Sequence, residues 1–301
     1  MIPWRLARGT LLDCSSPLLV GIINVTPDSF ADGGRHLDPS HARDAALAMV
    51  AAGAGMLDLG AESTRPGAAR IDGPTQMARL LPVIRAIRLA APAIPLSVDT
   101  TLASVARMAI DEGVSAVNDV SGGSEDAGMA PLVAATGAGM IVMHRLTTPE
   151  KDSYSDRYER PPAYADVESD VTRAFATRLL PALARAGVAP EQIVVDPGLG
   201  FGKSVEDNLR LIDAASRMSV ALGRPVMSAL SRKSFVGRVS LGRDSTPAER
   251  LEGTLALSVL HLLRGARIFR VHDVEPHARA IRAAWAAMEA SSAVPEATRR
   301  G

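Results

Sequence analysis

Eight short apolar runs each end in a polar side chain whose type is suited to binding or catalysis. Alternate side chains of a strand point to opposite faces. The last position on one face of each run holds, in chain order, Asn24, Asp58, Asp99, Asn118, His144, Asp196, Ser231 and His272. The intervening positions are apolar, as at Ile23, Leu57, Leu59, Val98, Val117, Val195 and Val271. One such polar residue could simply satisfy a turn, but eight carboxylates, amides, hydroxyls and imidazoles at one opening indicate an enzyme.

The segments after the first two runs contain groups suited to phosphate chemistry. Asn24 offers a neutral oxygen for a hard cation such as Mg²⁺ carried by a phosphate, and the Gly- and Asp-rich stretch behind it is expected to be a mobile loop. Thr64 and Arg65 precede Pro66 and supply a hydroxyl and a guanidinium for an anion. Taken singly, either segment could be ordinary turn chemistry.

The later segments add a cationic side and an acidic side. Residues 196–204 (DPGLGFGKS) bring three glycines, Phe201 and Lys203 to the opening, where Lys203 is expected to be solvated. Lys233 follows the seventh run, and the eighth supplies Arg270 and His272. The cationic groups Arg65, Lys233, Arg270 and His272 would face Asp99 and Asp196. Such a site could hold an anionic leaving group at one end and a ring rich in N–H donors at the other.

Two other chemistries find no support in the sequence. No His/Cys cluster has the spacing of a zinc site. No G-x-S-x-G turn suggests a serine nucleophile. His144 could be a buried hydrogen-bonding residue as readily as a catalyst.

Strands alternating with helices must position these groups. The predicted strands are 18–25, 56–60, 95–100, 115–120, 139–144, 192–197, 225–230 and 267–272, and the helical stretches include 40–53, 75–91, 102–112, 168–186, 205–217, 246–264 and 274–290. Eight βα units in this length predict an α/β fold, a single (β/α)8 TIM barrel. The alternative is an open doubly wound sheet, which lacks support because no G-x-G-x-x-G turn follows the first strand.

The domain organisation follows from these elements. Residues 1–17 are an N-terminal extension, 18–290 form the barrel, and 291–301 are expected to be a disordered tail. One polar insertion, 146–166, contains all three tyrosines and could be a lid, a partner contact or a plain surface loop.

Composition narrows the class of protein. The formal net charge is zero, so the sequence suggests neither a nucleic-acid nor a membrane surface. No targeting segment is recognised, and Cys14 is the only cysteine, which excludes an internal disulfide. A cytoplasmic protein is expected.

Seven loop motifs in register make the sequence recognisable. Together they resemble those of the dihydropteroate synthases, in the pterin-binding barrel family, and span about residues 18 to 275. The motifs are GIINVTPDSFADGG, DLGAESTRPGA, SVDT, AVNDVSGG, DPGLGFGKS, LSRKS and FRVHD.

The resemblance implies a transferase of folate biosynthesis. Such an enzyme joins 6-hydroxymethyl-7,8-dihydropterin diphosphate to 4-aminobenzoate and releases diphosphate, with Mg²⁺ as cofactor and as a homodimer, and it is the sulfonamide-target type. The implied catalytic residues are Asp99, Lys233 and Arg270, and the implied pterin-binding residues are Asp99, Asn118, Asp196, Lys233 and Arg270. Diphosphate would bind Asn24, which also meets the metal, and Arg65, Arg270 and His272. Aminobenzoate would bind Thr64, Pro66, Phe201 and Ser234.

The sequence departs from the family pattern in two places. Arg145, Leu146 and Thr147 interrupt a Met-His-Met-x-Gly-x-Pro-like run, and Ala229 stands where a glycine is common. These changes leave open a non-catalytic relative that binds pterin without turnover. A second alternative is a methyltetrahydrofolate-handling methyltransferase, which would need no diphosphate site; the NVTPDSF loop, Arg65 and the RVH end argue against it. A third alternative is a sugar-phosphate barrel enzyme, which would need a Gly-rich phosphate loop after the seventh or eighth strand; SRKS and RVHD match such a loop poorly.

Overall fold

The computed structural model describes residues 3–26 and 38–292, and its centre is a parallel eight-stranded barrel. The strands are β3 (Leu18–Asn24), β4 (Met56–Gly60), β5 (Leu96–Asp99), β6 (Ala116–Asp119), β7 (Gly139–Met143), β8 (Ile193–Asp196), β9 (Met227–Ser228) and β10 (Ile268–Val271). They pair in the order β8-β7-β6-β5-β4-β3-β10-β9. A bridge between Val195 and Val226 joins the two ends and closes the barrel. The predicted TIM barrel is confirmed, and all eight strands lie at the predicted places.

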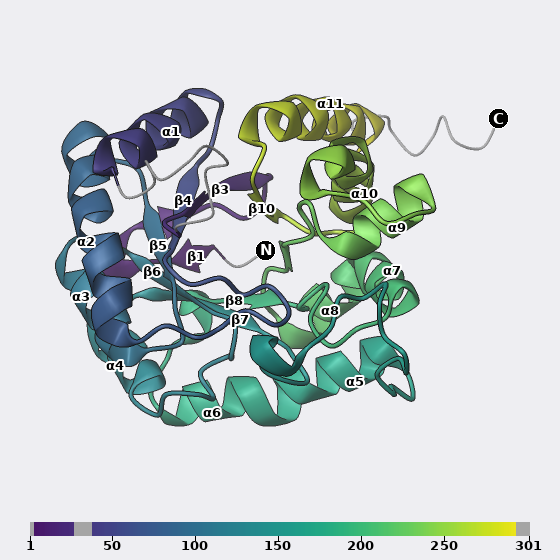
Figure 1. Cartoon of the computed structure of the whole chain (residues 1–301), viewed down its shortest axis with the longest axis horizontal. Coiled ribbons are helices and arrows are strands. Elements are labelled where there is room, and N and C mark those ends of the chain that lie inside the picture. Colours follow the sequence, from purple (N-terminus) through teal and green to yellow (C-terminus); the bar gives the residue numbers. More distant parts are fainter. Residues whose placement is uncertain (1–2, 27–37, 293–301) are drawn as a thin grey trace.

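Helices surround the strands on all sides (Figure 1). They are α1 (Pro39–Ala51), α2 (Gly73–Ala90), α3 (Ala103–Asp111), α4 (Met129–Thr136), α5 (Val167–Ala174), α6 (Leu180–Arg185), α7 (Val205–Asp213), α8 (Ala215–Leu222), α9 (Ser234–Leu241), α10 (Leu251–Leu263) and α11 (Val274–Ser292). Short turns of tighter helix lie at Ala7–Gly9, Pro149–Lys151, Pro190–Gln192 and Pro247–Arg250, and a π-helical turn, Phe175–Leu179, joins α5 to α6.

Local sequence explains where several helices begin and end. The side chains of Asp38, Asp72, Asp166 and Ser204 each accept a hydrogen bond from a backbone N–H in the first turn of α1, α2, α5 and α7. Glycines in the left-handed conformation end α4, α8 and α9. Two helices, α4 and α9, were not among the predicted ranges. Helix α4 is apolar with little amphipathic contrast, so no 3.6-residue pattern marks it.

Two apolar cores lie on the two sides of the barrel wall. The larger core, between strands and helices, contains Ile23, Leu57, Val98, Val195 and Val271 with the other intervening residues predicted to face the helices. The smaller core fills the barrel itself with side chains of the opposite parity, among them Val20, Met56, Ala116, Ile141, Val194, Met227 and Ile268. The predicted alternation of the strands is therefore confirmed.

A hairpin formed by β1 (Trp4–Arg5) and β2 (Leu11–Leu12) closes the N-terminal end of the barrel. Trp4 is fully buried, and its indole Nε1 donates to the carbonyl of Gln192 at 2.9 Å, just before β8. Ala7 N donates to Ser115 O at 3.0 Å, just before β6. Cys14 lies buried in the same inner core, and burial raises the pKa of its thiol to about 11. The segment predicted as an extension is thus the floor of the barrel.

The ends of the predicted regions differ slightly from the structure. Helix α11 continues to Ser292, so the first two residues of the predicted tail are helical. The rest of that tail, and most of the predicted mobile loop after β3, lie outside the described residues. In the described parts of the chain, no helix combines the length and apolar character that a membrane crossing requires.

Candidate active site

Polar side chains converge at the C-terminal ends of the strands, as predicted for seven of the eight positions. The exception is His144. Ile141 lies in the inner core and Met143 clusters with Val120 and Phe201 at the mouth, so the inward parity of β7 ends at Met143. His144, one residue later, points outward and lies near Phe175 of the outer core. The prediction that His144 ends the inward face of its strand was therefore wrong by one residue.

Asp58 organises the centre of the mouth. Its side chain is fully buried and accepts three hydrogen bonds: from Ser97 Oγ at 2.6 Å, from Asn118 Nδ2 at 3.0 Å and from Arg270 Nε at 2.6 Å. Arg270 also donates from Nη2 to Asp99 at 2.7 Å. One guanidinium therefore bridges carboxylates from two neighbouring strands, and three predicted site residues meet around Asp58.

The acidity of Asp99 reflects this crowding. Burial is the main cause that raises the pKa of its carboxyl to about 7, opposed by Arg270 and reinforced by Asp58. Asp58 and Asp99 share the single positive charge of Arg270, so their two negative charges are only partly compensated. A further positive charge next to Asp99 would be stabilised.

Asp196 and Lys233 form a second group beside the first. Asp196 accepts a hydrogen bond from Gly198 N at 2.7 Å, and burial raises the pKa of its carboxyl. The Lys233 ammonium donates to the carbonyl of Leu199 and lies 4.4 Å from the ring centre of Phe201. Burial lowers the pKa of Lys233 to about 8, against the opposing effect of Asp196. Phe201 is buried with Val120 and Met143, so an apolar wall borders the charged groups.

Lys203 has a different place from the one predicted. It is fully buried rather than solvated, and its Nζ donates to the carbonyls of Phe201 at 2.9 Å and His144 at 3.3 Å. Its Nζ also lies 3.2 Å from His144 Nδ1. Burial lowers the pKa of Lys203 to about 7, and burial together with Lys203 lowers that of His144 to about 3. Lys203 ties the loop after β8 to the end of β7, below the mouth.

The turn that presents Lys233 is held by its neighbours. Arg232 has a φ of 59°, the left-handed region that side chains with a Cβ rarely adopt. Its guanidinium pairs with both oxygens of Asp273, and its carbonyl accepts from Arg250 at 2.8 Å. Lys233 is then the N-cap of α9, and Ser234 is the first residue of that helix. The positive end of α9 therefore opens beside Lys233.

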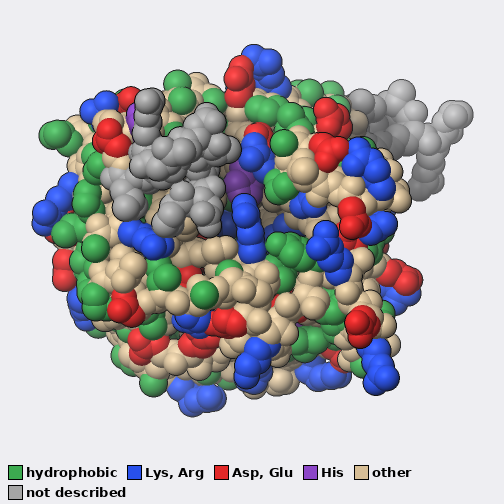
Figure 2. Space-filling view, viewed as in Figure 1, with side chains coloured by type: hydrophobic (Ala, Val, Ile, Leu, Met, Phe, Trp, Pro, Cys, Tyr) green, Lys and Arg blue, Asp and Glu red, His purple; other side chains and the backbone are tan. Residues whose placement is uncertain are grey.

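His272 lies among cations and is held by Ser231. Ser231 Oγ accepts from His272 N at 3.2 Å and lies 3.0 Å from its Nδ1. Burial, followed by the positive charges of Arg270 and Arg232 and more weakly Arg65, lowers the pKa of His272 to about 3. The imidazole is therefore neutral at physiological pH. In the space-filling view, Lys and Arg side chains gather around a histidine near the centre of the face (Figure 2).

The remaining predicted residues border this centre. Asn24 ends β3, and a side chain built at Gly60 would lie between Asn24 Oδ1 and Asp99. Thr64 and Pro66 are half-buried and Arg65 is exposed in the loop after β4. Within residues 3–26 and 38–292, no three His, Cys, Asp or Glu side chains form a group that could hold a metal ion.

Sequence reasoning missed some residues that shape the site. Asp58 was placed on the inward face, but nothing in the spacing showed that it binds both Asn118 and Arg270. Arg232 and Asp273 pair across 41 positions of sequence. In the sequence, Arg232 and Asp273 could be noticed only because they stand next to Lys233 and His272 in the LSRKS and FRVHD motifs.

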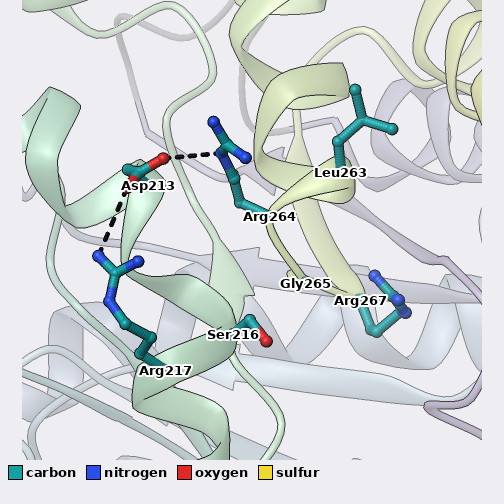
Figure 3. A pocket seen from close by; sticks show the side chains of 7 residues that line it. All are labelled: Asp213, Ser216, Arg217, Leu263, Arg264, Gly265 and Arg267. Atoms are coloured by element: carbon teal, nitrogen blue, oxygen red, sulfur yellow. Dashed lines mark hydrogen bonds and ion pairs between the residues drawn. The ribbon is translucent and has the colours of Figure 1, made fainter.

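A surface hollow of about 420 Å³ lies where the C-terminal ends of α7 and α10 meet the start of α8 (Figure 3). Asp213 pairs there with Arg217 and Arg264, and all three side chains are about half exposed. None of the predicted site residues lines it. The lining residues are Asp213, Ser216, Arg217, Leu263, Arg264, Gly265 and Arg267.

Comparison with known proteins assigns the family. The family model described as pterin binding enzyme matches residues 20–272, from within β3 to His272 just after β10. This chain belongs to the pterin-binding enzyme family. Among curated relatives, the dihydropteroate synthase of Mycobacterium leprae is 44% identical over 273 residues, covering 89% of this chain and 93% of that protein. The Escherichia coli K12 enzyme of the same name is 37% identical over 284 residues, covering 94% and 96%.

Solved structures of family members agree. Xanthomonas albilineans dihydropteroate synthase with 4-aminobenzoic acid is 36% identical, with a TM-score of 0.84 over 97% of this chain and 100% of that one. The same enzyme in complex with 7,8-dihydropteroate is 34% identical, with a TM-score of 0.81 over 97% and 100%. The chain is accordingly a transferase of the dihydropteroate synthase type, an enzyme of folate biosynthesis that transfers alkyl or aryl groups other than methyl. This excludes the sugar-phosphate alternative.

Proposed function

We propose that this pterin-binding enzyme condenses 6-hydroxymethyl-7,8-dihydropterin diphosphate with 4-aminobenzoate by Mg²⁺-assisted dissociative substitution. The observation that carries the proposal is the adjacency of two groups at one mouth. Buried acidic and amide side chains, Asp99, Asn118 and Asp196, adjoin cations that lie around a neutral His272. A ring with N–H donors fits the first group and a diphosphate fits the second.

The pterin would lie over the barrel mouth. Asp196 can accept two hydrogen bonds from a guanidine-like N–H edge, which is the planar contact that carboxylates make with such edges. Asn118 is fixed by its bond to Asp58 and can read a further ring position. Lys233 supplies a donor beside Asp196, and the planar guanidinium of Arg270 offers a face for the ring.

The diphosphate would bind the cationic side. Ser231 Oγ accepts the His272 backbone N–H and lies 3.0 Å from Nδ1. In the tautomer in which Nδ1 accepts from Ser231 Oγ, Nε2 carries the N–H and can donate to a phosphate oxygen. Arg65 and Arg270 supply positive charge, and Asn24 offers one neutral oxygen at the end of β3.

The residues present fit a magnesium ion delivered with the substrate. Mg²⁺ usually binds through substrate phosphates, water and only one or two protein oxygens, which Asn24 can supply. When bound, the ion would neutralise charge that develops on the departing diphosphate. The protein contributes Asn24 to its coordination.

The aminobenzoate would meet the mouth from the side of α9. Phe201 provides an apolar wall, and Thr64 and Pro66 lie on the loop after β4. The backbone at Ser234 begins α9, whose positive end suits a carboxylate. The related Xanthomonas albilineans enzyme has been solved with 4-aminobenzoic acid, which supports this choice of second substrate.

The chemistry follows from these positions. The bond between the pterin methylene carbon and the diphosphate oxygen breaks first, and Arg65, Arg270 and His272 stabilise the leaving group. The methylene carbon becomes cation-like next to Asp99, the group found above to lack positive charge. The neutral arylamine nitrogen then forms the new C–N bond and loses a proton to water. No strong base is required, so positioning supplies most of the rate.

We also propose that two copies of the chain associate through the outer helices, as the family resemblance implies. Four exposed apolar side chains on the neighbouring helices α9 and α10 support this surface: Val239, Leu241, Leu260 and Leu263. Sedimentation equilibrium would test whether the protein is a dimer.

A cytoplasmic location of the protein stays a prediction.

The deciding experiment supplies both substrates and Mg²⁺ to the purified protein. Radiolabelled 4-aminobenzoate reports dihydropteroate, and released diphosphate is measured in parallel. Product should disappear on chelation and in Asp196→Ala and Lys233→Ala, whereas Lys151→Ala, at an exposed lysine, should leave it unchanged. Pterin binding by calorimetry without product would favour the non-catalytic alternative, and absence of binding would refute the proposal.

A further inference from the structure

The residue that replaces the family's usual methionine after β7 is a buried, ion-paired arginine. The side chain of Arg145 is only 8% exposed, and its Nη2 donates to Glu125. Its Nη1 is buried without a hydrogen-bond partner in the described part of the chain. Packing alone would favour an apolar side chain here, because a buried unpaired N–H destabilises the fold. What the arginine adds is therefore its bond to Glu125.

Glu125 passes this contact to a second arginine. Arg70 Nη1 donates to Glu125 at 2.8 Å, and Arg70 Nη2 donates to Thr101 Oγ1 at 2.8 Å. Arg70 Nε lies 3.2 Å from Glu62 and 3.5 Å from Glu150. Two arginines and three glutamates thus connect the segments after β4, β6 and β7. We refer to Arg145, Glu125 and Arg70 as the ionic chain.

The ionic chain ends on the loop formed by residues 61–72. At the neck of this loop, Glu62 accepts a hydrogen bond from Ile71 N at 2.8 Å in addition to its pair with Arg70. Near its tip, Gly67 N donates to the carbonyl of Pro149 at 2.9 Å. Pro149 and Glu150 belong to the polar insertion that follows Arg145. The neck of the loop is therefore closed by Glu62 with Glu150 3.5 Å from Arg70, and the tip is bonded to Pro149.

We propose that Arg145 is a positioning residue for 4-aminobenzoate. Through Glu125 and Arg70 it holds the 61–72 loop, and with it Thr64 and Pro66, against the mouth. The 146–166 insertion acts in the same direction through Pro149 and Glu150, which gives that segment a role. This inference rests on the proposed function, which assigns Thr64 and Pro66 to the aminobenzoate.

Arg145→Met breaks the ionic chain while restoring the residue type usual in the family. Its KM for 4-aminobenzoate should rise about tenfold, the effect of losing one partly buried charged hydrogen bond. The KM for the pterin diphosphate and the kcat should stay within about twofold of the wild-type values, because the residues assigned to the pterin do not contact the ionic chain. Glu125→Gln should act in the same direction. Arg160→Met, at an exposed arginine of the same insertion, is the matched control.

A second measurement needs no turnover. Amide hydrogen exchange of residues 61–72 in the substrate-free protein should be faster in Arg145→Met and unchanged in Arg160→Met. Arg145→Lys, which keeps a positive charge beside Glu125, should exchange more slowly than Arg145→Met. Unchanged exchange, or an equal rise in KM for both substrates, would overturn the proposal. If the unmodified protein makes no product, the proposed function fails, while the exchange data still decide whether Arg145 holds the loop.

Discussion

Replacing Asp58 by asparagine tests whether one buried carboxylate organises the mouth. Asparagine has nearly the same shape and keeps one oxygen to accept from Asn118 and Arg270, while its NH₂ can donate to Ser97 Oγ. The substitution therefore removes the charge beside Arg270 and little else. Arg270 keeps Asp99 as its remaining carboxylate.

The expected loss of stability can be worked out. Removing one partner of a buried ion pair costs ~3–5 kcal/mol, and the contact of Arg270 with Asp99 places Asp58→Asn near ~3 kcal/mol. An unfolding entropy of roughly 2.1 cal/mol/K per residue gives about 0.6 kcal/mol/K for 301 residues. The Tm should therefore fall by about 5 °C.

Turnover should suffer more than folding. Arg270 and Asn118 both lose the anion that orients them, and misplacement of positioning groups by about 1 Å can lower a rate roughly 10²-fold. Scanning calorimetry gives the Tm, and the labelled-aminobenzoate assay below that temperature gives kcat. Ser97→Ala removes one hydrogen bond to Asp58 without changing charge. This control should cost about 1 kcal/mol, or about 2 °C.

Either of two results would refute this reasoning. A wild-type Tm and kcat in Asp58→Asn would mean that Asp99 alone fixes Arg270. A loss in Ser97→Ala as large as that in Asp58→Asn would mean that packing, rather than charge, matters at this position.

Three further predictions concern protonation and the barrel floor. Burial raises the pKa of Asp99 to about 7, and the proposed mechanism uses its ionised form. The kcat/KM for the pterin diphosphate should therefore rise as the pH passes through about 7. The pH–rate profile of Asp99→Asn should lack that rise. Burial lowers the pKa of Lys203 to about 7, from 10.5, so the folded protein releases a proton that the unfolded chain keeps. Thermal unfolding should therefore show the wild type gaining stability relative to Lys203→Met between about pH 7 and about pH 10; a flat difference would contradict this. Trp4→Ala should lower the Tm by about 6 °C, from ~4 kcal/mol of lost packing, with kcat unchanged at 25 °C; a changed kcat would link the floor to the mouth.

Much of the barrel could be predicted because its signals are local. Alternating apolar runs defined all eight strands, and the inward polar residues followed from counting along each run. The count failed at His144 because the run was taken one residue too far, and parity reverses at every step. The sequence analysis gave no range for helix α4, because its side chains are apolar on most sides and leave no periodic pattern to read.

The long-range contacts of the site could not be predicted from sequence. The role of Asp58 depends on a hydrogen bond to Arg270, which is 212 positions away. Lys203 looked like a solvated lysine because its glycine-rich segment resembles an open loop, yet it is fully buried against two carbonyls. Residue types showed what chemistry was available, whereas the barrel decided which groups meet.

The hairpin that floors the barrel has a consequence for folding during synthesis. Trp4 and Leu6 leave the ribosome early, but the surface that receives them includes Gly139 and Gln192, and the barrel closes only when β9 and β10 have been made. Contacts so distant in sequence form slowly. We expect the hairpin to dock late, leaving its tryptophan accessible to chaperones and quenchers until translation is nearly complete. Tryptophan fluorescence on arrested nascent chains would time that last step.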